Sequence, residues 1–189
     1  MVPSDVDAAA LRSLHADGFR GARFNLLFGG GVALDALERV ATRVAQEGWH
    51  IQLLMDIRQL PGIADRLLAL PCAVVFDHLG HFPAQEGMES AVSAALQRLL
   101  DGGRCWVKLS GGYRLSSLPP PYGDLRAVAG WLAARWPERM LWGSDWPHTA
   151  FEGDMPNDGD LLDTLADWVP DEATRQRILV DNPARLYGF

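Results

Sequence analysis

The stretch 139–148 (RMLWGSDWPH) contains the residue with the strongest claim to chemistry, Asp145. Its apolar beginning is typical of a buried parallel strand, and α/β proteins place catalytic groups just beyond the carboxyl ends of such strands. Trp142 and Trp146 are expected to surround the carboxylate with apolar surface, which would raise its pKa and favour a general-base role. The alternative is a strand-to-loop turn in which Asp145 only caps a helix.

A histidine occupies the equivalent place after a second apolar run. The segment 72–77 (CAVVFD) predicts a buried strand, and His78 follows it directly. Two histidines and a carboxylate in the sequence DHLGH could form a metal site or an acid–base site. We assign the chemistry to His78 and expect His81 to be a loop residue. The alternative for His78 is a structural histidine.

Two arginines stand near the ends of other predicted strands. Arg23 lies in the run 19–27, and Arg114 follows the run 105–110. A guanidinium in a buried setting needs an anion, and its planar fork binds carboxylates at two points. Both arginines are therefore candidate substrate receptors, with a salt bridge to an acidic side chain as the alternative for each.

The composition restricts the class of protein. The 189 residues are 48% hydrophobic and carry a formal net charge of -7, which predicts a single soluble domain, residues 1–189, and excludes nucleic acid as the main partner. Cys72 and Cys105 lie in apolar runs and are expected to be buried free thiols. We expect no membrane span and no signal peptide, so that a cytoplasmic location is the default.

Helical and strand patterns alternate along the chain. Strands are predicted at 19–27, 49–56, 72–77, 105–110 and 140–142. Helices are predicted at 6–17 (capped by Ser4 or Asp5), 34–46, 60–70, 88–100, 125–136, 161–168 and 172–179, and loops at 28–31 and around 115–122. Alternation of this kind predicts a parallel sheet with right-handed crossovers. The polar residues then meet at one rim, as in a barrel, although a closed barrel of this class has eight strands.

Six motifs together carry a resemblance to a known family. They are FRGARFN, VVFDHLGH, WVKLSGGYRLS, RMLWGSDWPH, MPNDG and LVDNPARLYGF. The sequence resembles the amidohydrolase-related TIM-barrel family, and within it the branch of the 2-pyrone-4,6-dicarboxylate lactonases. The resemblance implies an α/β fold of (β/α)8 TIM-barrel type, incomplete, in which the five strands correspond to strands four to eight.

The resemblance also implies roles for individual residues. Asp145 matches the general base that acts on the attacking water, and His78 matches the histidine that polarises the lactone carbonyl or holds the water. Arg23 and Arg114 match the arginines that grip substrate carboxylates. The predicted substrate-binding set is Arg23, Arg114, Asn25, Ser110 and His148. A further arginine of the dicarboxylate lactonases has no counterpart around residues 28–30, so a sugar lactone or a monocarboxylate is an equally open substrate.

The family's first strand carries a His-x-His pair that this sequence lacks, since its histidines stand at 15, 50, 78, 81 and 148. We therefore expect a metal-independent lactonase with no cofactor, because His78 and Asp145 alone are too few ligands for the zinc found in the wider family. One alternative is a fragment or subunit that is catalytically incomplete and needs an N-terminal partner or a second copy. Another is a zinc-dependent decarboxylase or amidohydrolase, completed by an upstream segment.

Overall fold

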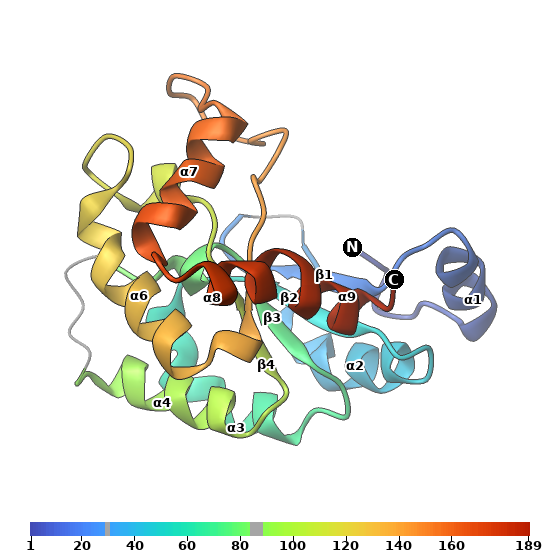
Figure 1. Ribbon diagram of the computed structural model, residues 1–189. Helices are drawn as coiled ribbons and strands as arrows, with labels where there is room; N and C mark the ends of the chain where they lie inside the picture. The colour runs from blue at the N-terminus through green and yellow to red at the C-terminus, as the bar shows by residue number, and fades with distance from the viewer. Residues whose placement is uncertain (29–30, 84–88) are drawn as a thin grey trace.

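The computed structural model describes residues 1–28, 31–83 and 89–189 (Figure 1). Part of the predicted loop at 28–31 and the first residue of the predicted helix at 88–100 lie outside these ranges. Within them, helices and strands alternate along the chain in the predicted order.

Five parallel strands form the sheet, in the order β1-β2-β3-β4-β5. They are β1 (Gly21–Asn25), β2 (His50–Leu54), β3 (Val74–Phe76), β4 (Cys105–Lys108) and β5 (Met140–Leu141). Each strand therefore pairs with the next one along the chain, and all five carboxyl ends point the same way. This arrangement confirms the predicted parallel sheet.

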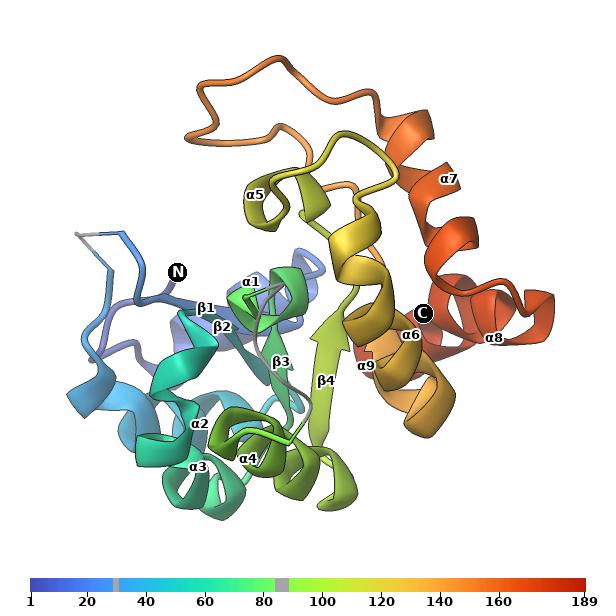
Figure 2. The ribbon, with the colours of Figure 1, turned by 90° about the vertical axis from the view of Figure 1, so that its left-hand side faces the viewer.

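Helices precede, separate and follow the strands. They are α1 (Ala8–Ala16), α2 (Leu37–Ala45), α3 (Leu60–Ala69), α4 (Ala91–Asp101), α5 (Gly112–Leu115), α6 (Arg126–Arg135), α7 (Asp158–Trp168), α8 (Glu172–Gln176) and α9 (Asn182–Tyr187). A π-helical turn, Arg177–Asp181, joins α8 to α9. Helices α2, α3 and α4 lie side by side below the sheet (Figure 2).

The cap of the first helix differs from the prediction. Asp7, and neither Ser4 nor Asp5, occupies the N-cap position, where its Oδ1 accepts a hydrogen bond of 2.7 Å from the backbone N–H of Ala10. The reason is that the helix begins two residues later than predicted, at Ala8. A cap must stand immediately before the first helical turn to reach its free N–H groups.

The two faces of the sheet bury different side chains. On β2, Ile51 and Leu53 point into the main apolar core beneath the helices. On the opposite face, Val75, Trp106 and Leu141 form a smaller apolar cluster, against which Leu186 and Ala73 pack. Leu186 belongs to α9, so the last helix covers the inner face of the sheet. The polar side chains described below lie next to this inner cluster, towards the carboxyl ends of the strands.

The two cysteines are free and buried, as predicted. Burial raises the pKa of the Cys72 thiol to about 11, so it is protonated at neutral pH. Within the described residues, no helix combines the length and the apolar composition that crossing a bilayer requires.

Candidate active site

A cavity of about 360 Å³ opens at the carboxyl ends of the strands. It is lined by Arg23, Asn25, Phe28, Leu54, His78, His81, Arg114, Asp145, Trp146, Pro147, Thr149 and Ala150. The residues predicted to do the chemistry therefore come together here from β1, β3 and the segments that follow β4 and β5. This end of a parallel sheet is where (β/α) folds build their active sites.

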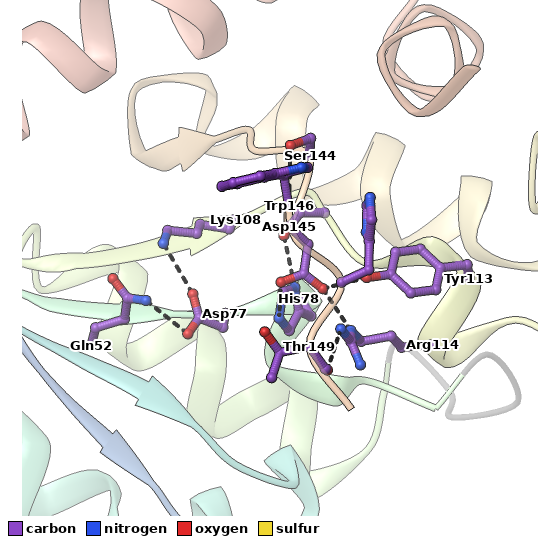
Figure 3. A network of polar contacts seen from close by, with 12 residues as sticks. Gln52, Asp77, His78, Lys108, Tyr113, Arg114, Ser144, Asp145, Trp146 and Thr149 are labelled. Atoms are coloured by element: carbon purple, nitrogen blue, oxygen red, sulfur yellow. Dashed lines mark hydrogen bonds and ion pairs between the residues drawn. The ribbon is translucent and has the colours of Figure 1, made fainter. Parts of the chain in front are cut away.

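The two oxygens of Asp145 have different surroundings (Figure 3). Oδ2 accepts hydrogen bonds of 2.6 Å from Nε of Arg114 and 2.6 Å from the hydroxyl of Tyr113. Oδ1 lies 3.4 Å from Nε2 of His78. Oδ2 is thus held by two hydrogen-bond donors, whereas Oδ1 faces the imidazole of His78.

The raised pKa predicted for Asp145 is wrong. Burial by itself would raise it, but the nearby ring of His78 and the hydrogen bonds from Tyr113 and Arg114 outweigh burial, and the pKa of Asp145 is lowered. The expected apolar surround is also incomplete, because Trp146 lines the cavity while 74% exposed and Trp142 packs against the core. Asp145 is consequently ionised at neutral pH and able to accept a proton.

His78 is held in a neutral, buried state. It is 5% exposed, and burial lowers its pKa, although the carboxylate of Asp145 acts in the opposite direction. Its Nδ1 lies 3.0 Å from Oγ of Ser110. Gly111 makes room for the ring, because a Cβ there would stand 2.7 Å from Nδ1, and its φ of +67° suits glycine.

The turn that begins at His78 has an unusual backbone. His78, Leu79, Gly80 and His81 have φ values of 50°, 53°, 67° and 56°. Residues other than glycine rarely adopt this left-handed region, and such strain gathers at functional sites, where the surrounding structure maintains it. The turn directs both histidines towards the cavity.

Sequence reasoning missed His81, which was expected to be an ordinary loop residue. It lines the cavity, its ring centroid lies 5.7 Å from that of His78, and burial lowers its pKa to about 4. Its Nε2 has no hydrogen-bond partner among the described residues. The available signal was the second histidine of the sequence DHLGH, three residues beyond His78, which was already assigned to the site.

A buried carboxylate organises the charges below the cavity. Asp77 is 2% exposed, and its Oδ2 lies 3.0 Å from Nε of Arg23 while its Oδ1 lies 3.1 Å from Nζ of Lys108. Nε2 of Gln52 also donates to Oδ2 of Asp77, at 2.9 Å. Figure 3 shows the contacts of Asp77 with Lys108 and Gln52. Two cations share one carboxylate, so this group carries a net positive charge.

Arg23 and Arg114 both form salt bridges, as the alternative interpretation of each arginine had it, but the two differ in their access to the cavity. The side chain of Arg23 remains 40% exposed and lines the cavity, so it can still meet an anionic ligand. The side chain of Arg114 is 12% exposed and binds Asp145 through Nε, and its Nη2 donates to the backbone oxygen of Thr149 at 3.0 Å. Arg114 therefore both binds Asp145 and lines the cavity, and its predicted contact with substrate stays a prediction.

The predicted substrate contacts of Ser110 and His148 stay predictions. Neither lines the cavity. Ser110 contacts His78 from behind. His148 is 4% exposed, with Nδ1 2.9 Å from the Tyr113 hydroxyl and Nε2 3.2 Å from Oδ1 of Asp158. Both residues therefore contact side chains around the site: Ser110 contacts His78, and His148 contacts Tyr113 and Asp158.

Asn25 lines the cavity, and its predicted role in substrate binding stays a prediction. Its Oδ1 accepts hydrogen bonds from the backbone N–H groups of Leu27, at 3.2 Å, and Phe28, at 3.0 Å. These bonds hold the turn after β1 through the side-chain oxygen of Asn25.

The described residues do not fit a zinc site by themselves. Among them, no group of three or more histidine, cysteine, aspartate or glutamate side chains is placed to hold a metal ion. His78 and Asp145 come nearest, but Oδ2 of Asp145 already binds the guanidinium of Arg114, a cation that would repel a metal beside it. A catalytic zinc needs three protein ligands.

Comparison with known proteins identifies the family. The family model described as amidohydrolase matches residues 1–189. The chain belongs to the amidohydrolase family. This finding confirms the resemblance drawn from the six motifs.

Relatives of this chain carry names that refer to lactones. The chain is 38% identical to 4-sulfomuconolactone hydrolase of Rhizobium radiobacter, over 94% of this chain and 61% of that protein. It is 36% identical to D-galactarolactone isomerase of Agrobacterium fabrum, again over 94% of this chain and 61% of that protein. The amidohydrolase chain therefore spans less than two thirds of the length of these curated relatives.

A solved structure confirms the fold. The crystal structure of a putative 2-pyrone-4,6-dicarboxylic acid hydrolase from Pseudomonas putida superimposes with a TM-score of 0.86 at 31% identity, covering 100% of this chain and 70% of that one. The predicted fold class, TIM-barrel type with five strand–helix units in this chain, agrees with that likeness and with the sheet order.

Proposed function

We propose that this site hydrolyses a lactone that carries an anionic group, with Asp145 as the general base. The observation that carries the proposal is the placement of Oδ1 of Asp145, which lies 3.4 Å from Nε2 of His78 at the wall of a cavity that Arg23 also lines. Relatives named as lactone hydrolases support the reaction class.

Each group has a defined task in this proposal. Asp145 takes a proton from water as the water oxygen bonds to the lactone carbonyl carbon. The ring C–O bond then breaks, and the proton held by Asp145 passes to the departing ring oxygen. The product is an open-chain hydroxy acid, and the base returns to its ionised state.

His78 supplies a hydrogen-bond donor to the carbonyl oxygen. Its lowered pKa keeps the ring neutral, so only one of its nitrogens carries a proton. The hydroxyl of Ser110, 3.0 Å from Nδ1, can donate to that nitrogen, which places the proton on Nε2. Nε2–H then faces the reacting centre, where negative charge develops as water attacks.

Arg23 sets the charge of the substrate. It lies at the end of the cavity above Asp77 and Lys108, a group with a net positive charge. A carboxylate or sulfonate on the lactone would neutralise this positive charge and would accept charge-assisted hydrogen bonds from the guanidinium of Arg23. A pyrone dicarboxylate and a sugar-acid lactone both carry such an anionic group, so both remain candidate substrates.

The proposed reaction uses no metal or organic cofactor. Its support is the donor set, in which Arg114 occupies Oδ2 of Asp145. Elemental analysis of the purified chain checks this part. Zinc present at one equivalent, and lost from the Asp145→Asn variant, would show that Asp145 serves as a metal ligand.

A lactone isomerase is the second candidate, because one relative bears that name. The two reactions differ in what happens to water. We would incubate the chain with carboxylated lactones in H₂¹⁸O and analyse the products by mass spectrometry. Hydrolysis places one ¹⁸O atom in the product carboxylate, whereas an isomerisation that never opens the ring to solvent leaves the label in water.

A third candidate is a site completed by groups outside this chain, either from a separate polypeptide or from a second copy. The support for it is the 61% share of the curated relatives that the chain spans. Under this proposal the chain alone gives no ¹⁸O incorporation with any lactone tested. Light scattering on the same sample establishes whether it is a monomer or a homo-oligomer.

A further inference from the structure

A line of polar contacts runs from Asp145 away from the cavity. The Tyr113 hydroxyl lies 2.6 Å from Oδ2 of Asp145 and 2.9 Å from Nδ1 of His148. Nε2 of His148 lies 3.2 Å from Oδ1 of Asp158. Tyr113, His148 and Asp158 are absent from the cavity lining, within the part of the chain that the structure describes. These three residues therefore contact Asp145, directly or through one another, from outside the cavity.

Three separate elements contribute to this line. Tyr113 belongs to α5, which follows β4, and Asp158 is the first residue of α7. His148 lies between them in the loop after β5, the same loop that carries Asp145, and is 4% exposed. Figure 3 shows the Tyr113 ring beside Asp145 together with Arg114, while His78 lies at the other oxygen.

The number of protons fixes the direction of the hydrogen bonds. An ionised Asp145 can only accept, so Tyr113 donates its single hydroxyl proton to Oδ2. Nδ1 of His148 must then carry a proton and donate it to the Tyr113 oxygen. The other ring nitrogen of His148, Nε2, lies 3.2 Å from Oδ1 of Asp158.

We propose that Tyr113 and His148 are positioning residues that act through Asp145, holding its Oδ2 so that its Oδ1 is presented to water and His78. Asp158 anchors the outer end of the line. The catalytic consequence rests on the proposed lactone hydrolysis, whereas the geometric claim concerns Asp145 alone.

The geometry indicates why one arginine is not enough to hold the carboxylate. The fork of Arg114 can bind both oxygens of a carboxylate at once. In the structure it binds only Oδ2, which it shares with the Tyr113 hydroxyl. Removing that hydroxyl leaves Oδ2 with one donor fewer and frees the carboxylate to turn its second oxygen towards Arg114 and away from His78.

Tyr113→Phe is the sharpest variant, because it removes the hydroxyl and keeps the ring. The ring contacts with Phe151, at a centroid distance of 4.7 Å, and with the Arg114 guanidinium, at 4.9 Å, both survive the change. The variant His148→Gln tests the contact between His148 and the Tyr113 hydroxyl, and Asp158→Asn tests the contact between Asp158 and His148. Tyr187→Phe is the matched control for the lost hydroxyl, and its ring packs against His50.

Asp160→Asn is the matched control for the lost charge, because Asp160 lies in the same first turn of α7 and has no contact with His148. The variants His148→Gln and Tyr113→Phe are both checked for folding by circular dichroism, and the conservative Tyr113→Phe decides the outcome if His148→Gln does not fold.

The first readout is the titration of Asp145 itself, followed by NMR in the full chain labelled with ¹³C at aspartate carboxyls and assigned with Asp145→Asn. The groups that face Asp145 are His78, Arg114 and Tyr113. We expect its midpoint to rise by about one unit in Tyr113→Phe, the size of one hydrogen bond to a charged group. A smaller rise is expected in His148→Gln, and none in either control. An unchanged midpoint in a folded Tyr113→Phe would overturn the proposal, whether or not the chain turns over a lactone.

The second readout applies once turnover is established by ¹⁸O incorporation. Tyr113→Phe should lower kcat about tenfold with KM nearly unchanged, because the tyrosine touches the base and not the substrate. A raised KM at constant kcat would assign Tyr113 to substrate binding and overturn the proposal. Absence of turnover in the wild-type chain would count against the proposed function, and the NMR result would still decide the positioning role.

Discussion

Asp145 and His78 meet at one rim of the sheet, with Oδ1 of the carboxylate 3.4 Å from Nε2 of the imidazole. They arrive there from different strands, since His78 follows β3 and Asp145 follows β5. The carboxylate has a lowered pKa, and so does the imidazole. At neutral pH the pair is therefore an ionised carboxylate beside a neutral imidazole, the combination that the proposed attack of water on a lactone uses.

Replacing Asp145 with asparagine should abolish most lactone turnover. We expect kcat to fall by about 100-fold to 10,000-fold, the usual contribution of a general base, because an amide cannot accept the proton of water. Steady-state kinetics on an anionic lactone measure the loss. Asp154→Asn is the control, an exposed aspartate in the same loop, and should leave kcat unchanged. Equal kinetics for Asp145→Asn and the wild type would remove Asp145 from the mechanism.

The pH profile follows from the two lowered pKa values. Asp145 is active when ionised, so kcat/KM should be constant at neutral pH, and the acid limb that belongs to Asp145 should lie below its ordinary pKa of 3.8. His78 acts as the neutral ring, and its pKa lies below 6.5, so no inflection is expected near 6.5. Initial rates measured across this range test both statements. An acid limb centred near pH 6.5 would contradict the assignment of a neutral His78.

Arg23 should govern affinity for the anionic group of the substrate. In Arg23→Gln we expect KM to rise about tenfold to 100-fold for a carboxylated lactone, the value of one charge-assisted interaction, with a smaller change in kcat. An uncharged lactone of the same ring size should show no such rise. Arg126→Gln, at an exposed position on α6, serves as the control. A similar rise for the charged and uncharged lactones would mean that Arg23 acts on the fold and not on the charge.

Asp77 should be a major contributor to stability. It is 2% exposed and neutralises Lys108 as well as Arg23, so Asp77→Leu leaves a largely buried ammonium without its partner. We expect the free energy of unfolding to fall by about 3 kcal/mol, the usual cost of breaking a buried pair from one side. Urea denaturation measures it. The double variant Asp77→Leu/Lys108→Met should recover part of the loss, and a double variant as unstable as the sum of its single changes would contradict this account.

Gly111 should be required for the position of His78. A methyl group there would stand 2.7 Å from Nδ1, and the φ of +67° is unfavourable for alanine. We expect Gly111→Ala to lose about 1–2 kcal/mol of stability and to lower kcat. The control is Gly62→Ala in α3, where a methyl group meets nothing within 4 Å. A Gly111→Ala variant with wild-type kcat would show that His78 tolerates displacement.

The sequence by itself determined the order of elements and the end of the sheet at which the site lies. Short apolar runs at the five strands are separated by amphipathic helices, and this alternation admits little besides a parallel sheet. Because parallel strands direct their carboxyl ends the same way, Arg23, His78, Arg114 and Asp145 had to gather at one rim once each was recognised as following a strand.

Only the tertiary structure decided which side chain binds which. Arg114 forms an ion pair with Asp145, Asp77 forms one with Arg23, and His148 contacts the hydroxyl of Tyr113. Residue spacing reports the face and the end of an element on which a side chain lies, but the distance to a partner depends on how separate elements pack together. A pKa depends on the charges and hydrogen-bond donors at such distances. The pKa of Asp145 is therefore lowered, although its apolar neighbours in the sequence predicted that it would be raised.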